Sequence, residues 1–326
     1  MIKSLVLGNK TFSNNLIQGP LAGVSSSPFR ILTFQYGAPA FCCTEMLSCK
    51  ALLHKSRLTY ERYLHKDAKE GPVCFQLFGN SPEDAAKAAK IVTDYGADLI
   101  DLNCGCPVKK VRRQGAGSAL LSDAARLYNI LSAIKKNTHL PVGAKIRVAG
   151  GGVEQFNADV AKAVSDSGID FLVVHGRRWT EHYETPCRYD QIEFFVKEMK
   201  IPVIGNGDVF DLDSLKKMLA TGCAGAMIAR GGVGRPWLAR ELIAKMRGEE
   251  FTLPIASEIG AIFLQHVNLL LTIFVSDRSA VLNARKVAKY YARCLSSKPR
   301  KEFCVAINSC SDLQSLQKLV GRYFVT

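Results

Sequence analysis

Short apolar runs recur along the first three quarters of the chain, and each is followed by a polar or glycine-rich turn and an amphipathic stretch. The runs are apolar on both faces, which is typical of strands buried in a parallel sheet. They span residues 16–19, 40–44, 73–78, 99–103, 142–146, 171–175, 202–205 and 225–229. Eight such strand–helix units predict an α/β protein with a parallel (βα)8 barrel, because doubly wound sheets more often have about five to seven strands.

The stretches between these runs carry the signals of helix N-termini. Ser81 is followed by Pro82 and two acidic residues, a pattern typical of a capping serine with proline at the first helical position. Asp123 and Asp211 precede two further amphipathic stretches in the same way. These signals support helices between the predicted strands.

The alternation stops near residue 244, and helical periodicity continues to the end of the chain. We therefore expect a barrel domain over residues 1–243 and a domain of four helices over residues 244–326, with Pro254 in the linker. The most apolar window, residues 261–275, contains polar side chains and is too short to span a bilayer. It predicts a buried helix, and we expect no membrane segment.

The charge balance favours a polyanionic partner. There are 43 Lys and Arg against 29 Asp and Glu, a formal net charge of +14. Each basic residue that neutralises a phosphate releases a counterion, so such an excess suits nucleic acid. The alternative is a charged surface that only keeps the protein soluble.

The predicted tail concentrates this charge. Its basic residues in about two dozen positions are Arg278, Arg285, Lys286, Lys289, Arg293, Lys298, Arg300 and Lys301. Tyr290 and Tyr291 lie among them, and aromatic rings between cations suit a surface that stacks bases and holds phosphates. The alternative is a charged outer helix face with the tyrosines turned inward.

The 11 cysteines are odd in number and irregular in spacing, and no secretion signal precedes them. This pattern predicts reduced thiols in a cytoplasmic protein rather than a disulfide framework. Cys104 and Cys106 are two positions apart, and no second pair follows as zinc would require. We expect no metal.

In a (βα)8 barrel the active site lies at the C-terminal ends of the strands. Nearly every predicted strand here ends in a polar or glycine-rich group. The endings at 206–208 and 229–232 lie after strands seven and eight, where such barrels often bind phosphate. Gln76, Lys145 and His175 together suit the polar edge of a flavin ring, although singly Gln76 can cap a turn and His175 can be a core histidine.

The segment 101–109 carries the sharpest chemistry. Asn103 ends a strand, Gly105 lets the chain turn, and Pro107 stiffens the next part of the loop, so Cys106 is held in a fixed position at the site. A thiol there can give a proton to a carbanion or enolate carbon. The alternative is a buried cysteine that only packs, which is the interpretation we give to Cys104.

Two features come directly after this loop. Four cations, Lys109, Lys110, Arg112 and Arg113, would favour a thiolate and could receive RNA phosphates. Residues 115–118 have the composition of a flexible lid or loop.

With these residues identified, the chain resembles the tRNA-dihydrouridine synthase family. The segments that carry the resemblance are 20–24, 44–46, 76–79, 101–109, 145–147, 175–177, 205–208 and 230–237, and in the tail 284–286 with 290–291. The element Asn-x-Gly-Cys-Pro-x-x-Lys, which begins at Asn103, is highly specific.

The resemblance implies FMN bound in the barrel mouth, reduction of the flavin by NADPH, and hydride transfer from flavin N5 to C6 of a uridine in tRNA, with Cys106 giving a proton to C5. It assigns FMN contacts to Pro20, Leu21, Ala22, Gln76, Lys145, His175, Asn206, Gly207, Asp208, Ala229 and Arg230. It assigns contacts with the target uridine to Asn103, Gly105 and Arg147. Such an enzyme would be cytoplasmic, and we expect a monomer.

Two positions depart from the family pattern. Leu21 stands where the family usually has Met, which preserves apolar volume. Ala229 stands where it usually has Gly, which is tolerated unless φ is positive there. Arg188 aligns too loosely to be assigned a role.

Three other functions compete with this interpretation. A flavin barrel acting on a free pyrimidine would share the flavin frame but would not need the basic tail. A tRNA-binding protein on a degenerate barrel would not need Cys106, Lys145 and His175 together. A basic DNA-binding protein would carry a recognisable module, and none is found.

Overall fold

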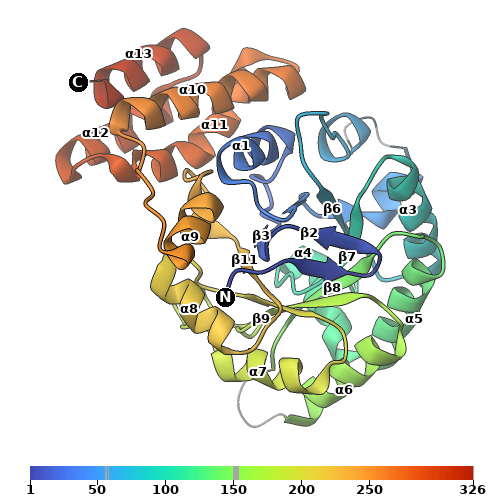
Figure 1. The fold of residues 1–326 in the computed structure, drawn as a ribbon. Coiled ribbons are helices and arrows are strands. Elements are labelled where there is room, and N and C mark those ends of the chain that lie inside the picture. The colour runs from blue at the N-terminus through green and yellow to red at the C-terminus, as the bar shows by residue number, and fades with distance from the viewer. Residues whose placement is uncertain (56, 58, 150–153, 326) are drawn as a thin grey trace.

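The computed structural model describes residues 1–55, 57, 59–149 and 154–325. Its centre is a closed parallel barrel in which the last strand pairs with the first (Figure 1). The strands of the barrel are β3 (Leu16–Gln18), β4 (Cys42–Cys43), β5 (Leu47–Ser48), β6 (Val73–Phe78), β7 (Leu99–Cys104), β8 (Val142–Arg147), β9 (Phe171–His175), β10 (Val203–Asn206) and β11 (Gly225–Ile228). The predicted fold, a (βα)8 barrel followed by helices, is confirmed.

One position of the barrel is shared by two short strands, β4 and β5, which both pair with β6. The sequence predicted one strand over residues 40–44, whereas only Cys42–Cys43 forms a strand there. Thr44 comes next, and its side-chain Oγ1 accepts a hydrogen bond from the backbone N–H of Gln76 at 3.0 Å. The chain bends between the two strands, and the bend brings Met46 to the barrel mouth.

A short antiparallel hairpin closes the opposite end of the barrel, and the sequence did not predict it. It consists of β1 (Leu5–Leu7) and β2 (Lys10–Phe12), and in Figure 1 it lies across the front of the barrel. Leu7 is fully buried in the same apolar cluster as Phe41 and Phe171. Three-residue strands are too short to show alternation, which is why the pattern gave no signal.

Helices cover the outside of the barrel. They are α1 (Ser27–Gly37), α2 (Cys49–Leu53), α3 (Pro82–Asp94), α5 (Ala124–Lys135), α6 (Glu154–Asp166), α7 (Tyr189–Glu198), α8 (Leu212–Ala220) and α9 (Leu238–Arg247), with a π-helical turn at Thr59–Tyr63. The short α4 (Lys109–Arg112) instead follows β7 and lies inside this ring of helices in Figure 1. The predicted caps are present. Ser81 accepts from the Asp84 amide, Asp123 from the Arg126 amide, and Asp211 forms a capping box with Ser214.

The tail forms four α-helices within the described residues: α10 (Ala256–Ile273), α11 (Asp277–Tyr291), α12 (Ser297–Ala306) and α13 (Leu313–Phe324). The boundary predicted after residue 243 lies inside α9, because this last helix of the barrel continues to Arg247 and ends at Gly248, which adopts a left-handed conformation. The segment between α9 and α10 contains Pro254, as expected for the linker.

By length and composition alone, α10 could cross a membrane, with a mean hydropathy of 1.3 over 18 residues. In the fold it packs against α11, α13 and α1, and Phe263 and Val267 are fully buried. The predicted helix is therefore present, but it is buried on one face only, with 39% of its residues buried, and that face packs in the core of the tail.

The tail lies against α1 and the loop before α9, at the upper left of the barrel in Figure 1. Tyr36 on α1 donates a hydrogen bond to the side chain of Gln265 at 2.9 Å. At Gly234 a side chain would begin 2.4 Å from the backbone of Tyr290, so the two chain segments touch there. Tyr291 is 2% exposed, and its hydroxyl lies 3.1 Å from His266 Nδ1. Tyr291 is thus turned inward and does not belong to any stacking surface.

Candidate active site

The C-terminal ends of the barrel strands surround a cavity of about 400 Å³. Every residue for which the sequence predicted a catalytic, cofactor or substrate role lines it: Cys106; Pro20, Leu21, Ala22, Gln76, Lys145, His175, Asn206, Gly207, Asp208, Ala229 and Arg230; and Asn103, Gly105 and Arg147. The lining also includes residues that the sequence predictions left without a role, among them Met46, Arg177, Tyr183, Phe210 and Met227. Arg177 belongs to the segment 175–177 that carried the resemblance, whereas Tyr183 had no signal.

Cys106 is 8% exposed and is held by its own loop. Asn103 Oδ1 accepts hydrogen bonds from the amides of Cys106, at 2.9 Å, and of Gly105, at 3.2 Å. From the other side, the Ser118 amide donates to the Cys106 carbonyl at 3.1 Å. A side chain at Gly117 would begin 2.8 Å from that carbonyl oxygen, and φ there is +60°, so the close approach requires glycine.

Residues 115–118 are not a flexible lid. Ala116, Gly117 and Ser118 are buried, and Gly117–Ser122 forms a 3-10 helix packed behind the cysteine loop. The glycines that suggested mobility serve the close contact with Cys106 instead.

A buried chain of polar side chains supports Asn103. Asn103 Nδ2 donates to Gln76 Oε1 at 2.9 Å, and Gln76 Nε2 donates to Asp101 Oδ2 at 2.5 Å. Asp101 is 1% exposed, and burial raises the pKa of its carboxyl to about 7, against the Gln76 hydrogen bond and the charge of Lys145. The sequence placed Asp101 in the motif but gave it no role.

Lys145 projects from β8 into the cavity. Its Nζ donates to Asn206 Oδ1 at 2.6 Å, and the Asn206 amide donates to the Met227 carbonyl at 2.9 Å. Burial, and then the charge of Arg147, lower the pKa of Lys145 to about 8. An ammonium group held in this way can donate to an acceptor in the cavity.

His175 ends β9, and a buried arginine lies beside it. Arg177 is 1% exposed, and its Nη1 lies 3.2 Å from His175 Nε2. Burial holds the pKa of His175 well below its usual range, and the charges of Lys145, Arg147 and Arg177 add to the effect. The imidazole is therefore neutral at physiological pH.

The same arginine fastens the loop after β9 over the cavity. Arg177 donates to the carbonyls of Tyr183, at 3.1 Å, and Thr185, and its Nη2 pairs with the carboxylate of Asp208 after β10. Arg188 pairs with Glu181 within this loop and does not line the cavity. Arg177 is thus one of several groups that hold this loop, together with Arg147, which donates to the Arg178 carbonyl, and Asp208, which accepts from the Cys187 amide.

The strand endings after β10 and β11 form the part of the cavity where the sequence predicted phosphate binding. A side chain at Gly207, whose φ is +130°, would begin 2.6 Å from Cys187 Sγ. Asp208 is a left-handed non-glycine residue with φ +54°, and its carboxylate also accepts from the Cys187 amide at 3.1 Å. Ala229 has φ −119°, so alanine fits where the family usually has glycine. The guanidinium of Arg230 lies 4.2 Å from the centre of the Tyr183 ring.

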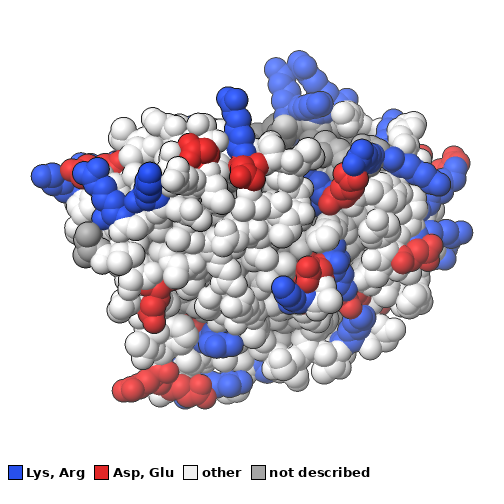
Figure 2. Space-filling model, turned by 90° about the horizontal axis from the view of Figure 1, so that it is seen from above, with Lys and Arg blue, Asp and Glu red and all other residues white. Residues whose placement is uncertain are grey.

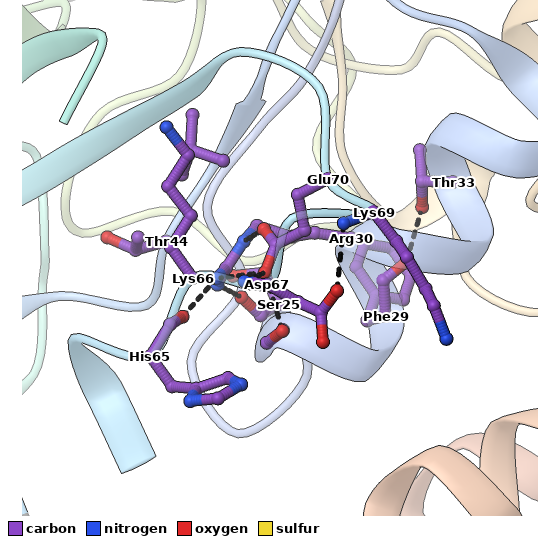
Figure 3. Close-up of polar contacts among 12 residues, drawn as sticks. Ser25, Phe29, Arg30, Thr33, Thr44, His65, Lys66, Asp67, Lys69 and Glu70 are labelled. Atoms are coloured by element: carbon purple, nitrogen blue, oxygen red, sulfur yellow. Dashed lines mark hydrogen bonds and ion pairs between the residues drawn. The ribbon is translucent and has the colours of Figure 1, made fainter. Parts of the chain in front are cut away.

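The loop that carries Pro20 to Ala22 rests on a buried ion pair between α1 and the segment before β6 (Figure 3). Arg30 pairs with Glu70 at 2.6 Å, and both side chains are at most 1% exposed. Arg30 also donates to the Ser25 carbonyl at 2.8 Å, and Ser25 Oγ accepts from the Leu21 amide at 2.9 Å. The ion pair thereby holds the loop at the cavity wall.

Basic side chains do not form one continuous patch on the face of the molecule that Figure 2 shows. Arg112 on α4 lies 3.3 Å from the centre of the Trp179 ring, in the loop after β9. Figure 2 shows Lys and Arg side chains projecting around the edge of the molecule, with acidic side chains interspersed. Among the described residues, no group of His, Cys, Asp and Glu is arranged to hold a metal.

The chain matches known proteins over nearly its whole length. The family model described as Dihydrouridine synthase (Dus) matches residues 17–323. A protein of Pseudomonas putida named tRNA-dihydrouridine synthase B is 36% identical over 321 residues, which cover 98% of this chain and 94% of that protein. A probable tRNA-dihydrouridine synthase of Rickettsia prowazekii is 32% identical over 324 residues, covering 98% of this chain and 97% of the relative.

Solved structures match at the level of the fold. An old yellow enzyme homologue from Zymomonas mobilis has a TM-score of 0.54 at 14% identity, covering 76% of this chain and 93% of its own. A morphinone reductase variant in complex with tetrahydroNAD has a TM-score of 0.54 at 15% identity, covering 78% of this chain and 93% of its own. At these identities the likeness is one of architecture.

Proposed function

Because the chain belongs to the dihydrouridine synthase family, we propose that it is a tRNA-dihydrouridine synthase that uses FMN and NADPH. The reaction reduces the C5=C6 bond of a uridine in tRNA to 5,6-dihydrouridine. The observation that carries this function is the cavity at the barrel mouth, which Cys106 shares with Lys145 and His175.

The cavity fits a flavin in size and chemistry. Its volume of about 400 Å³ lies within the range of roughly 300–1,000 Å³ that ligand pockets occupy. Apolar residues, Leu21, Ala22 and Met227 among them, line it together with polar groups. Lys145 has three N–H donors and gives one to Asn206, so it can still donate to an acceptor such as a carbonyl oxygen of the flavin ring.

The residues divide between two parts of the flavin. Gln76, Lys145 and His175 would hold the polar edge of the ring, and residues 20–22 would contact its apolar part. Asn206, Gly207 and Asp208 with Ala229 and Arg230 would hold the phosphate end. Close contacts at Gly207 and the negative φ of Ala229 fit backbone approach to a phosphate.

When bound and reduced, the flavin supplies a hydride to C6 of the uracil. Cys106 does the rest of the chemistry: its S–H bond breaks, a C–H bond forms at C5, and the thiolate left behind takes a proton from solvent. Asn103, held in the same loop, fixes the thiol by accepting from the Cys106 amide.

Asn103, Gly105 and Arg147 would contact the uridine. Arg147 is 6% exposed and is oriented by donation to the Arg178 carbonyl at 2.8 Å. Since uridine C5 and C6 are covered in a stacked helix, the base must leave the stack to enter the cavity. The net charge of +14 supports a tRNA substrate, which fits a cytoplasmic protein.

The first experiment is a count of dihydrouridine by mass spectrometry after unmodified tRNA is incubated with the flavin-loaded protein and NADPH. A gain of two mass units on one uridine is expected. If NADPH bleaches the flavin colour of the protein but tRNA gains no mass, the assignment of a flavin-binding barrel is supported and the assignment of tRNA as substrate is wrong. Free uracil and uridine in parallel reactions test the rival activity on a free pyrimidine.

A further inference from the structure

Asp101 is a buried carboxylate inside the barrel. It lies on β7, two residues before Asn103, and is 1% exposed. Oδ2 accepts from Gln76, whereas Oδ1 has no hydrogen-bond partner among the described residues. A buried carboxylate with an unsatisfied oxygen destabilises a fold, so its presence calls for an explanation beyond packing.

The hydrogen bonds of this carboxylate have a definite direction. An ionised carboxylate only accepts, so it turns the NH2 end of Gln76 toward itself and the oxygen end toward Asn103. Asn103 must then give its own NH2 end to Gln76. Its oxygen is left facing the cysteine loop, where it accepts from the amides of Gly105 and Cys106.

Both ends of this chain fix its direction, because the N–H groups of Gly105 and Cys106 need an oxygen from Asn103 and the carboxylate needs the NH2 end of Gln76. A turned Asn103 would present NH2 to two backbone N–H donors, and the loop would lose both of its hydrogen bonds to this side chain. Asp101 therefore supports, from two side chains away, the orientation of Asn103 that the loop amides require.

We propose that Asp101 is a positioning residue, which anchors the far end of the Gln76–Asn103 chain and thereby helps to hold Cys106 in place for proton transfer. Asp101 does not line the cavity, so it acts through these side chains. The proposal rests on the proposed function, since it concerns the same thiol.

The strand register supports the geometry. Gln76 pairs with Asp101 between β6 and β7, and Asn103 pairs with Lys145 between β7 and β8, so the four side chains come from three adjacent strands. Burial raises the pKa of Asp101 to about 7, whereas the Gln76 hydrogen bond and the charge of Lys145 favour its ionised form. The ionised form is the one that can only accept.

The test compares Asp101→Asn with Asp98→Asn in the flavin-loaded protein. Both are the same substitution near β7, but Asp98 lies at the closed end of the barrel, where it pairs with Lys10 and Lys66. An asparagine at 101 can face Gln76 with either end, so it no longer anchors its end of the chain. We expect kcat for tRNA uridine reduction to fall about 10- to 100-fold in Asp101→Asn, with less than about a twofold change in KM for tRNA. Asp98→Asn should lose stability only.

Two further measurements separate positioning from general damage. The rate at which Cys106 is alkylated can be measured by peptide mass spectrometry, with the exposed Cys294 as the internal reference. This rate should be higher in Asp101→Asn than in the unmutated protein, and unchanged in Asp98→Asn. Adding Asp101→Asn to Asn103→Ala should cost no further activity, because both act through one side chain.

Three results would overturn the proposal: an unchanged kcat in Asp101→Asn, an equal kcat loss in Asp98→Asn, or losses of Asp101→Asn and Asn103→Ala that multiply. Failure of the proposed function looks different, because then the unmutated protein makes no dihydrouridine at all.

Discussion

Arg177 Nη1 lies 3.2 Å from His175 Nε2, and because a guanidinium only donates, this ring nitrogen accepts the hydrogen bond. The neutral imidazole must then carry its proton on Nδ1. His175 is thus set as a hydrogen-bond donor through Nδ1, with its acceptor nitrogen already occupied.

This relationship predicts the tautomer and the low pH at which the ring takes up a proton. In 15N NMR spectra of labelled protein, His175 should show the Nδ1–H form at neutral pH and should take up a proton only well below the pH at which an exposed histidine does, because burial holds its pKa well below the ordinary value. Arg177→Gln removes a nearby positive charge, so the pKa of His175 should rise. An Nε2–H signal in the unmutated protein would contradict the assignment.

Cys106 and Cys104 provide a matched pair for the proton-donor role. Cys106→Ala should keep flavin binding and NADPH-driven bleaching but lose dihydrouridine formation by about 100-fold or more. Cys104 is fully buried and does not line the cavity, so Cys104→Ala should keep activity and lose only stability. Product formation by Cys106→Ala at the unmutated rate would show that another group supplies the proton.

The buried pair of Arg30 and Glu70 should matter far more than a surface pair. Glu70→Gln leaves a buried guanidinium without its counter-charge, so the free energy of unfolding should fall by about 3–5 kcal/mol in urea titrations. The matched control is Glu61→Gln, which breaks the exposed pair with Arg57 and should cost less than about 1 kcal/mol. Equal losses in the two variants would mean that the buried pair has no special weight.

His266 predicts a loss of stability in acid. Burial lowers the pKa of His266 from 6.5 to about 4. Between these two pH values His266 is protonated in the unfolded chain but stays neutral in the folded protein. The stability from neutral His266 is complete above pH 6.5 and is lost as the pH falls toward about 4, at up to about 1.4 kcal/mol per pH unit.

His266→Gln is the comparison for this effect, since glutamine stays neutral and can still bond the Tyr291 hydroxyl. Urea unfolding at several pH values should show the unmutated protein losing about 2 kcal/mol relative to the variant between pH 7 and 4.5. Parallel pH profiles for the two proteins would assign the acid sensitivity to other groups.

The barrel could be predicted from the chain because its eight buried strands repeat one simple pattern, and the mouth residues are located by where those strands end. Asp101 could not be given its role, because a hydrogen bond between neighbouring strands leaves no mark on residue spacing. The loop at 115–118 was misjudged for a related reason: glycine signals freedom, but Gly117 is needed here for contact with the Cys106 carbonyl.

The tail shows a second limit. Tyr290 and Tyr291 are adjacent in the sequence and identical in type, but on a helix they face different directions. Tyr291 is packed against Phe263, with ring centres 5.0 Å apart, whereas Tyr290 stays partly exposed with Arg293 over its ring at 4.6 Å. Only the helix packing decides which of the two remains near the surface.

The pairing of β3 with β11 has a consequence for synthesis of the chain. Residues 16–18 cannot pair with residues 226–228 until the latter have been synthesised. A nascent barrel therefore keeps two unpaired edge strands until most of the protein has left the ribosome. The hairpin of β1 and β2 also cannot pack fully until β9 has been synthesised, since Leu7 is buried in the same cluster as Phe171. Closure depends on contacts distant along the chain and is therefore a slow, late step. Truncated chains that end before β11 should accordingly be held by chaperones or degraded, rather than accumulate as partial barrels.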